Sequence, residues 1–225
     1  MTALNVLVTE SSAHIITDGA GCAGTRLITY APKTVALPHL SCAAGFRGNL
    51  GVIQQLRFQL GLYASYDDMV LNIAADLRRR WKWRCWLVPN LFHFDLVIAA
   101  FHQGKASAFM VSSVERPGAP AFEPLAIKYF WGAPQVEADR LRQFVAAMEG
   151  NLDAAAFSLL DEQRRKGAVV VGGYGQITSA GPRGIETRLL GHWDDRRGKA
   201  IERSTPPARP TSDLLTLKGS TDWRG

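Results

Sequence analysis

The sequence predicts an α+β fold in which antiparallel sheets are covered by helices. Segments with strand character fall into three groups, and two pairs of segments with helical periodicity separate these groups. Segregated runs of this kind favour antiparallel sheets over a doubly wound parallel fold. With 225 residues and 47% apolar side chains, the chain can bury a substantial core. The simplest packing is a single domain of sheets covered by two helix pairs.

The first group of strands occupies the N-terminal 46 residues. Apolar and β-branched side chains form short runs there, separated by turn-forming residues, as is typical of strands. The expected strands are residues 5–9, 13–17, 26–30, 34–37 and 40–46. Residues 19–24 read Gly-Ala-Gly-Cys-Ala-Gly, and this composition predicts a loop.

Two helices follow, because the apolar residues then recur at helical spacing. The residues that recur are Val52, Leu56 and Leu60 in the first helix and Met69, Ile73 and Leu77 in the second. Ser65 and Asp68, three residues apart, resemble a capping box and predict the start of the second helix. Its acidic start and the arginines at 78–80, which we place at its end, suit the helix dipole.

The rest of the chain continues with strands, two helices and strands. The expected strands are 94–101, 106–113 and 125–131, followed by helices 135–149 and 152–166 and a final strand pair, 168–171 and 185–190. The Gly-rich residues 172–175 lack a dinucleotide fingerprint and predict a turn or close backbone packing, with phosphate binding as the alternative. We expect residues 1–202 to form one domain and residues 203–225 to form a flexible, basic, Pro-containing tail.

The charge balance is basic, with 26 Lys and Arg residues against 20 Asp and Glu residues and a net charge of +6. Basic residues concentrate in the run 78–84, which also contains two tryptophans, and near the C-terminus. Two interpretations are open. The run and the tail are either solvated charged segments, or a nucleic-acid contact in which tryptophans stack on bases.

Three sparse cysteines, Cys22, Cys42 and Cys85, show no C-x-x-C spacing. They indicate reduced thiols in a cytoplasm-like compartment and neither a disulfide framework nor a zinc site. The sequence has no apolar run of about 18 residues, so we expect no transmembrane helix. The N-terminus also lacks the basic and apolar regions of a signal peptide. We therefore expect a cytoplasmic protein.

The N-terminus carries the most informative candidate site. The sequence contains no H-E-x-x-H, P-loop or G-x-S-x-G motif, and its five histidines are scattered. Removal of Met1 would leave Thr2 as the N-terminal residue. Its hydroxyl is a weak nucleophile, and its own α-amine, with a reference pKa of about 7.7–8.0, can serve as the general base. The alternative is that Thr2 belongs to a frayed terminus before a strand.

The residues after Thr2 extend this pattern. Asp18 lies sixteen residues after Thr2, Lys33 precedes the strand expected at 34–37, and Ala44-Gly45-Phe46-Arg47-Gly48 enters a helix. In these features residues 2 to about 113 resemble the proteasome β-subunit family, including the bacterial peptidase HslV. That family has an N-terminal Thr, an Asp sixteen residues on, a Lys near the next strand pair and a similar glycine turn.

The resemblance implies a role for each of four residues. Thr2 would be the nucleophile, and Asp18 would orient and balance the lysine. Lys33 would favour the neutral amine and stabilise negative charge, and the backbone N–H of Gly48 would form the oxyanion hole. A nearby cation lowers the pKa of an amine, and a pre-placed N–H stabilises a tetrahedral oxyanion by about 3 kcal/mol. The alternative is that Asp18 and Lys33 form a structural ion pair at a sheet edge.

The resemblance also implies the architecture and the activity. It implies a four-layer αββα sandwich, in which two antiparallel sheets are covered by helix pairs, as in N-terminal nucleophile hydrolases. The implied activity is a threonine-type peptidase that cleaves polypeptides or other amides without a metal or organic cofactor. The implied partners are further copies of the chain, in a homo-oligomeric ring, and an ATP-dependent unfoldase.

Three departures from the family favour a second interpretation, a catalytically inactive structural or assembly protein. Ala3 stands where the family usually has Thr, Ser or Cys, residues 130–133 lack the family's serine, and Arg47 replaces a small residue beside the proposed oxyanion donor. Arg47 could bind an acidic substrate side chain or obstruct the cleft. A nucleic-acid-associated module that uses residues 78–84 and the tail is the third interpretation.

Overall fold

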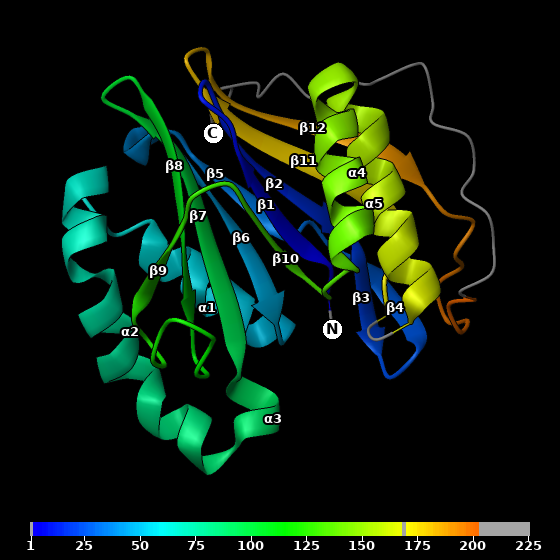
Figure 1. Ribbon diagram of the computed structural model, residues 1–225. Coiled ribbons are helices and arrows are strands. Elements are labelled where there is room, and N and C mark those ends of the chain that lie inside the picture. The colour runs from blue at the N-terminus through cyan, green and yellow to red at the C-terminus, as the bar shows by residue number, and fades with distance from the viewer. Residues whose placement is uncertain (1, 168–169, 203–225) are drawn as a thin grey trace, which may run out of the picture.

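The computed structural model describes residues 2–167 and 170–202 and has a mixed α/β fold (Figure 1). All its strand pairings are antiparallel, as expected. One sheet has the order β10 (Phe130–Ala133), β1 (Leu4–Val8), β2 (Ala13–Asp18), β11 (Tyr174–Gly181) and β12 (Gly184–His192). The other has the order β5 (Thr34–Leu37), β6 (Cys42–Gly48), β7 (Phe94–His102), β8 (Lys105–Ser112) and β9 (Pro124–Ile127). A separate hairpin pairs β3 (Ala20–Ala23) with β4 (Arg26–Tyr30).

Two pairs of longer helices complete the fold. They are α1 (Leu50–Leu60) and α2 (Tyr66–Leu87), followed later by α4 (Ala138–Gly150) and α5 (Leu152–Lys166); a short α3 (Pro89–Phe92) follows α2. Side chains cap three of the starts. The hydroxyl of Ser65 accepts the N–H of Asp68 at 3.1 Å, which confirms the predicted start of α2. Asn49 caps α1 and Asn151 caps α5 in the same way.

Three hydrophobic clusters show how these elements pack. The first joins α1 and α2 to the sheet that contains Phe46, and the second joins α4 and α5 to the sheet that contains Ile16 and Ile177. The third lies between the two sheets and contains Leu4 and Val97. Figure 1 accordingly shows one helix pair on each outer side of the two sheets. Because successive side chains of a strand point to opposite faces, both sheets are buried on two sides.

Residues 19–24, predicted to be a loop, instead contain β3. The small residues permit this because the hairpin packs tightly: a Cβ on Gly21 would lie 2.7 Å from Cγ2 of Thr29 on β4. Glycine therefore marks a close approach here and not a flexible turn.

Two further predictions of strands differ from the structure in where the strands begin and end and in which strands pair. Residues 125–131, predicted as one strand, divide into β9 and β10, which belong to different sheets. The final strand pair is β11 with β12, not 168–171 with 185–190; residues 170–171 are not in a strand, and 168–169 lie outside the described residues. The predicted tail, 203–225, also lies outside the described residues.

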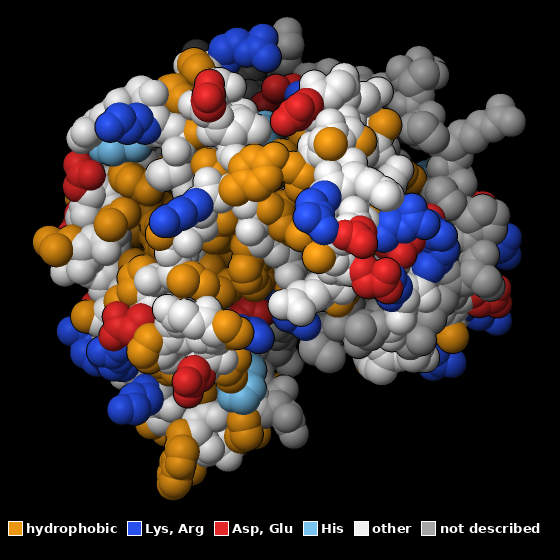
Figure 2. Space-filling model, in the orientation of Figure 1, with side chains coloured by type: hydrophobic (Ala, Val, Ile, Leu, Met, Phe, Trp, Pro, Cys, Tyr) orange, Lys and Arg blue, Asp and Glu red, His pale blue; other side chains and the backbone are white. Residues whose placement is uncertain are grey.

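The basic run 78–84 lies inside α2, which continues to Leu87, and is not the end of that helix. Trp81 is buried in the first cluster, while Arg78 and Arg79 pair with Glu123 and Asp76. Several large apolar side chains at the α2–α3 corner are nevertheless exposed, and Figure 2 shows apolar side chains protruding there. They are Trp83, Trp86, Leu87, Val88 and Leu91.

Within the described ranges, no helix combines the length and apolar character needed to span a membrane.

A buried histidine connects β2 to β11. Nε2 of His14 lies 2.8 Å from Oγ of Ser12, and Nδ1 lies 2.8 Å from Oγ of Ser179. Burial lowers the pKa of His14 to about 4, and the charge of Arg188 acts in the same direction, partly opposed by Asp153. The folded protein therefore keeps this imidazole neutral well below the pH at which an exposed histidine is protonated.

This shift predicts a loss of stability in acid. Between pH of about 6.5 and 4, the unfolded chain binds a proton at His14 that the folded chain does not bind. The stability is fully present above that window, and we expect up to about 3 kcal/mol to be lost across it. Urea denaturation at both ends of the window should show a smaller loss for His14→Gln than for the wild type. The exposed His39→Gln serves as the control, and equal losses in the wild type and His14→Gln would contradict the prediction.

Candidate functional site

The centre of the candidate site is the carboxylate of Asp18, the last residue of β2. It is fully buried and accepts four hydrogen bonds. Oδ1 accepts the backbone N–H of Ala3 at 2.9 Å and the ammonium of Lys33 at 2.8 Å. Oδ2 accepts the backbone N–H groups of Ala20 at 3.3 Å and Gly172 at 3.2 Å. A buried carboxylate needs partners of this kind, and this one holds four separate segments of chain together.

Lys33 precedes β5 and is only 2% exposed. Burial lowers the pKa of Lys33, because a low dielectric disfavours the charged form, while the carboxylate of Asp18 opposes that shift. The ion pair is therefore shielded from water. A cation in such a place acts strongly on neighbouring groups, because little solvent screens it.

Gly48, the last residue of β6, is connected to Lys33 through the backbone. The N–H of Phe46 donates to the carbonyl oxygen of Lys33 at 2.8 Å. Successive N–H groups of a strand point to opposite edges, so the N–H of Gly48 points to the same edge as that of Phe46. β5 begins at Thr34, opposite Gly45, and in the described part of the chain no strand of this sheet lies opposite Gly48 on that edge. This N–H therefore faces the region beyond Lys33.

Only glycine fits at position 48. Its φ is +147°, and a Cβ there would lie 2.8 Å from the carbonyl oxygen of His93. A side chain would require both a strained backbone and movement of the neighbouring chain. The position of the Gly48 N–H is thus fixed by local sterics.

Ala3, the residue after Thr2, holds the start of β1 next to Asp18. The N–H of Ala3 is bound to Asp18, so Thr2 lies at the end of β1 that is next to the Asp18–Lys33 pair. The start of β1 also packs on β6, since a Cβ on Gly45 would lie 3.0 Å from Cδ1 of Leu4. Thr2 is 4% exposed. The structure thus joins Asp18 and Lys33 directly. The N–H of Ala3, next to Thr2, bonds Asp18, and the N–H of Phe46, two residues before Gly48, bonds Lys33.

Two residues near the site were not assigned to it from the sequence. Burial raises the pKa of the Cys22 thiol on β3, with Lys33 opposing the shift and Asp18 adding to it, so it stays a thiol at neutral pH. Tyr174 opens β11, and a Cβ on Gly19 would lie 2.2 Å from its ring. The signal that could have located both residues is the small-residue run 19–24, which folds as a strand against the site.

A buried ion pair supports the loop that supplies Gly172. Arg164 on α5 binds both carboxylate oxygens of Asp195 at 2.7 and 2.8 Å and also donates to the carbonyl oxygen of Val171 at 3.0 Å. Asp195 in turn accepts the N–H of Gly173 at 2.7 Å. The residues on both sides of Gly172 are therefore fixed. This arrangement holds the Gly172 N–H in position for Asp18.

Comparison with known proteins identifies similar folds but no similar sequences. No family model and no curated protein matches the chain. The solved structures that resemble it include a Gly-1 mutant of Anbu from Hyphomicrobium sp. strain MC1 and Anbu (ancestral beta-subunit) from Yersinia bercovieri. Each is 11% identical to this chain with a TM-score of 0.61. The matches cover 87% of this chain and 90% and 89%, respectively, of those chains.

These findings correct the family assignment that the N-terminal motifs favoured. The assignment to the proteasome β-subunit and HslV family is wrong, because the similar structures are Anbu proteins and no family model matches. At 11% identity the likeness shows a shared fold alone. The predicted α+β class is confirmed in part, as a mixed α/β fold, and the chemistry must be argued from the site itself.

Proposed function

We propose that this chain is an amide hydrolase that uses Thr2 as an N-terminal nucleophile after removal of Met1, with polypeptides as the substrate class. The observation that carries the proposal is the double contact of one Asp18 oxygen, which binds both the N–H after Thr2 and the ammonium of Lys33. Through this shared oxygen, the buried ammonium of Lys33 is held close to the backbone that follows the proposed nucleophile. We also infer that the two sheets and helix pairs form the four-layer αββα sandwich, within one domain of residues 1–202.

The proposed mechanism uses two steps. The α-amine of Thr2 takes the proton from Oγ1, which attacks the carbonyl carbon, while the Gly48 N–H stabilises the oxyanion. The protonated amine then donates its proton to the leaving nitrogen, and an ester with Thr2 remains. Water, deprotonated by the same amine, attacks the ester carbonyl, and the amine returns this proton to Oγ1 as the acyl–oxygen bond breaks, which releases the acid and restores Thr2. The charge of Lys33 lowers the pKa of the amine so that it is neutral when it must accept a proton.

Self-assembly into a homo-oligomeric ring is part of the proposal. Its support is the likeness in fold to a chain described as an ancestral beta-subunit, together with the exposed apolar side chains at the α2–α3 corner. An unfoldase partner, nucleic-acid binding and cytoplasmic localisation stay predictions.

The test combines the mass of the purified protein with covalent labelling. We expect the native protein to begin at Thr2 and to be acylated once by a peptide β-lactone, which opens when Oγ1 attacks its carbonyl. Thr2→Ala should lose the label and at least about 10³-fold of amide hydrolysis, because the nucleophile is gone. Thr2→Ser is the matched control, since it keeps a hydroxyl, and it should retain the label. Labelling of Thr2→Ala at the wild-type rate would contradict the proposal.

A second candidate, an inactive assembly protein with this fold, is favoured by the burial of Thr2. An intact Met1 would convert the Thr2 amine to an amide and remove the base. A purified assembly that retains Met1 and resists the β-lactone would support this candidate and not the hydrolase.

A further inference from the structure

The segment that carries Lys33 is held by an arginine of α1. Nη2 of Arg57 donates to the carbonyl oxygens of Pro32 and Thr34, at 2.5 and 3.2 Å. It therefore binds the residues on both sides of Lys33. The carbonyl oxygen between these two, that of Lys33 itself, accepts the N–H of Phe46 at 2.8 Å. Three successive carbonyl oxygens are thus bound, two of them by one guanidinium.

The packing of Arg57 fixes the geometry of this contact. Its guanidinium lies over the ring of Phe46, 5.6 Å from the ring centroid, and the side chain is half-buried. Hydrogen bonds from a charged, partly desolvated donor are stronger than those between neutral groups. The Nε of Arg57 is nevertheless buried without a partner among the described residues, which costs stability. A local cost of this kind is typical of residues that serve a function besides stability.

The side chain of Lys33 requires such support because it is long and flexible. Its ammonium stands at the end of a four-carbon stem and contacts the carboxylate of Asp18 at 2.8 Å. A side chain of this length holds its charge at a fixed point only when the backbone that carries it is also fixed. The effect of a cation on a neighbouring group falls as the distance grows. Movement of the segment around Lys33 would therefore weaken the effect of its charge on the amine of Thr2.

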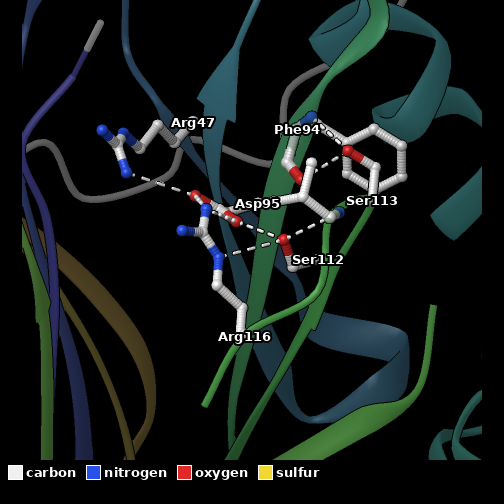
Figure 3. Close-up of polar contacts among 7 residues, drawn as sticks. Arg47, Phe94, Asp95, Ser112, Ser113 and Arg116 are labelled. Carbon is white, nitrogen blue, oxygen red and sulfur yellow. Dashed lines mark hydrogen bonds and ion pairs between the residues drawn. The ribbon is translucent and has the colours of Figure 1, made fainter. Parts of the chain in front are cut away.

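The Gly48 side of the site is held by different contacts (Figure 3). Arg47, the residue before Gly48, contacts the carboxylate of Asp95 on β7 at 3.4 Å. Nη2 of Arg116 binds both oxygens of Asp95, at 2.7 and 2.8 Å. The end of β6 therefore has ion pairs of its own. We expect a change at Arg57 to act on the lysine and to leave the N–H of Gly48 in place.

We propose that Arg57 is a positioning residue, which fixes the backbone on both sides of Lys33 and so keeps its ammonium close to the amine of Thr2. This inference rests on the proposed function for the role of that amine. In the proposed mechanism Arg57 contacts neither the substrate nor the reacting atoms, and it transfers no proton. Its influence on the reaction therefore depends on the presence of Lys33.

The first test is the pH dependence of β-lactone labelling of the full chain. The amine of Thr2 acts as a base only when it is neutral, so the labelling rate rises with pH through the pKa of this amine. In Arg57→Met, Lys33 should lower that pKa less. The midpoint of the rise should move up by about one pH unit, and the rate at neutral pH should fall by up to about tenfold. Arg57→Lys, whose ammonium reaches less far, should show a smaller shift and replaces Arg57→Met if that variant does not fold. Arg80→Met, at an exposed position of α2, is the control and should change neither value.

A double-mutant cycle separates positioning from a direct effect of the Arg57 charge on the amine. In the Lys33→Met background, Arg57→Met should not slow labelling further, because no ammonium remains to be positioned. A direct effect of the charge would persist in that background. The inference is overturned by an unchanged pH profile in Arg57→Met, or by an equal further loss of rate in the absence of Lys33.

Amide hydrogen exchange tests the positioning without any labelling. The N–H of Phe46, which is bound to the carbonyl oxygen of Lys33, should exchange about tenfold faster in Arg57→Met. The N–H of Ile177, in the interior strand β11 of the other sheet, should keep its rate. Equal acceleration of both amides, or no change at Phe46, would contradict the inference. If the wild-type protein is not labelled at all, the hydrolase is refuted, and exchange at Phe46 alone decides whether Arg57 holds the segment of Lys33.

Discussion

Lys33→Met is expected to reduce amide hydrolysis about 10³-fold. The ammonium of Lys33 is the buried cation of the site and contacts the carboxylate that also holds the residue after Thr2. Without it, the amine of Thr2 is protonated over more of the neutral range, and the oxyanion loses nearby positive charge. Methionine has a similar length, and Asp18 keeps three backbone N–H donors, so the chain should still fold. Turnover of a fluorogenic peptide per labelled site measures the effect.

A double variant separates catalysis from an ordinary structural ion pair. Lys33→Met leaves the Asp18 charge without its cation, and adding Asp18→Asn restores neutrality in the buried site. We expect thermal stability to recover in the double variant while activity stays low. Recovery of activity along with stability would mean that the pair is only structural. Lys105→Met, a substitution of an exposed lysine at the turn between β7 and β8, controls for the loss of one positive charge.

Arg164→Met is expected to cause the largest loss of stability, about 3–5 kcal/mol in urea denaturation. The pair with Asp195 is almost fully buried, with exposed side-chain fractions of 1% and 4%. Removing the arginine leaves a buried carboxylate without its cation, which costs more than the pair itself contributes. The guanidinium also donates to the carbonyl oxygens of Val171 and Glu202. These two acceptors would lose a partner in the same step.

The neighbouring Arg165→Met provides a matched control. Arg165 is 60% exposed and pairs with Asp161 and Glu162 on the surface of α5, so its loss should cost less than about 1 kcal/mol. Arg164→Met combined with Asp195→Leu should regain much of the stability, because the uncompensated charge is gone. Similar losses for the Arg164→Met and Arg165→Met variants would show that burial of the pair does not matter.

The elements predicted best from the sequence were those with a clear apolar pattern. The continuous apolar run of β7, which is buried on both faces, and the four-residue spacing in α1 and α2 follow directly from which faces are buried. The glycine-rich strands β3 and β11 were missed because small residues produce no apolar pattern in the sequence. Gly175 in β11 is an example: a Cβ there would lie 2.8 Å from the ring of Phe157, so α5 packs directly on the backbone.

The candidate site was predictable only in part. The resemblance of the N-terminal motifs implied an interaction between Asp18 and Lys33, and the structure contains it. The N–H of Gly172 binds Asp18 from 154 residues away, and a backbone donor has no sequence signature. The pair of Arg164 with Asp195, separated by 31 residues, likewise follows from the packing of α5 and not from a local pattern. The roles of Thr2 and Gly48 stay predictions, and the labelling experiment tests that of Thr2.

The edge of β6 that extends beyond the start of β5 has a consequence for which substrates could react. A peptide laid along Arg47 and Gly48 would complete the sheet there as an added strand, using main-chain groups that every sequence possesses. A folded protein has its own main-chain groups engaged internally and cannot offer a segment of this kind. The site would therefore discriminate by conformation before it discriminates by sequence, admitting termini, mobile loops and unfolded chains while the proteins around it stay intact.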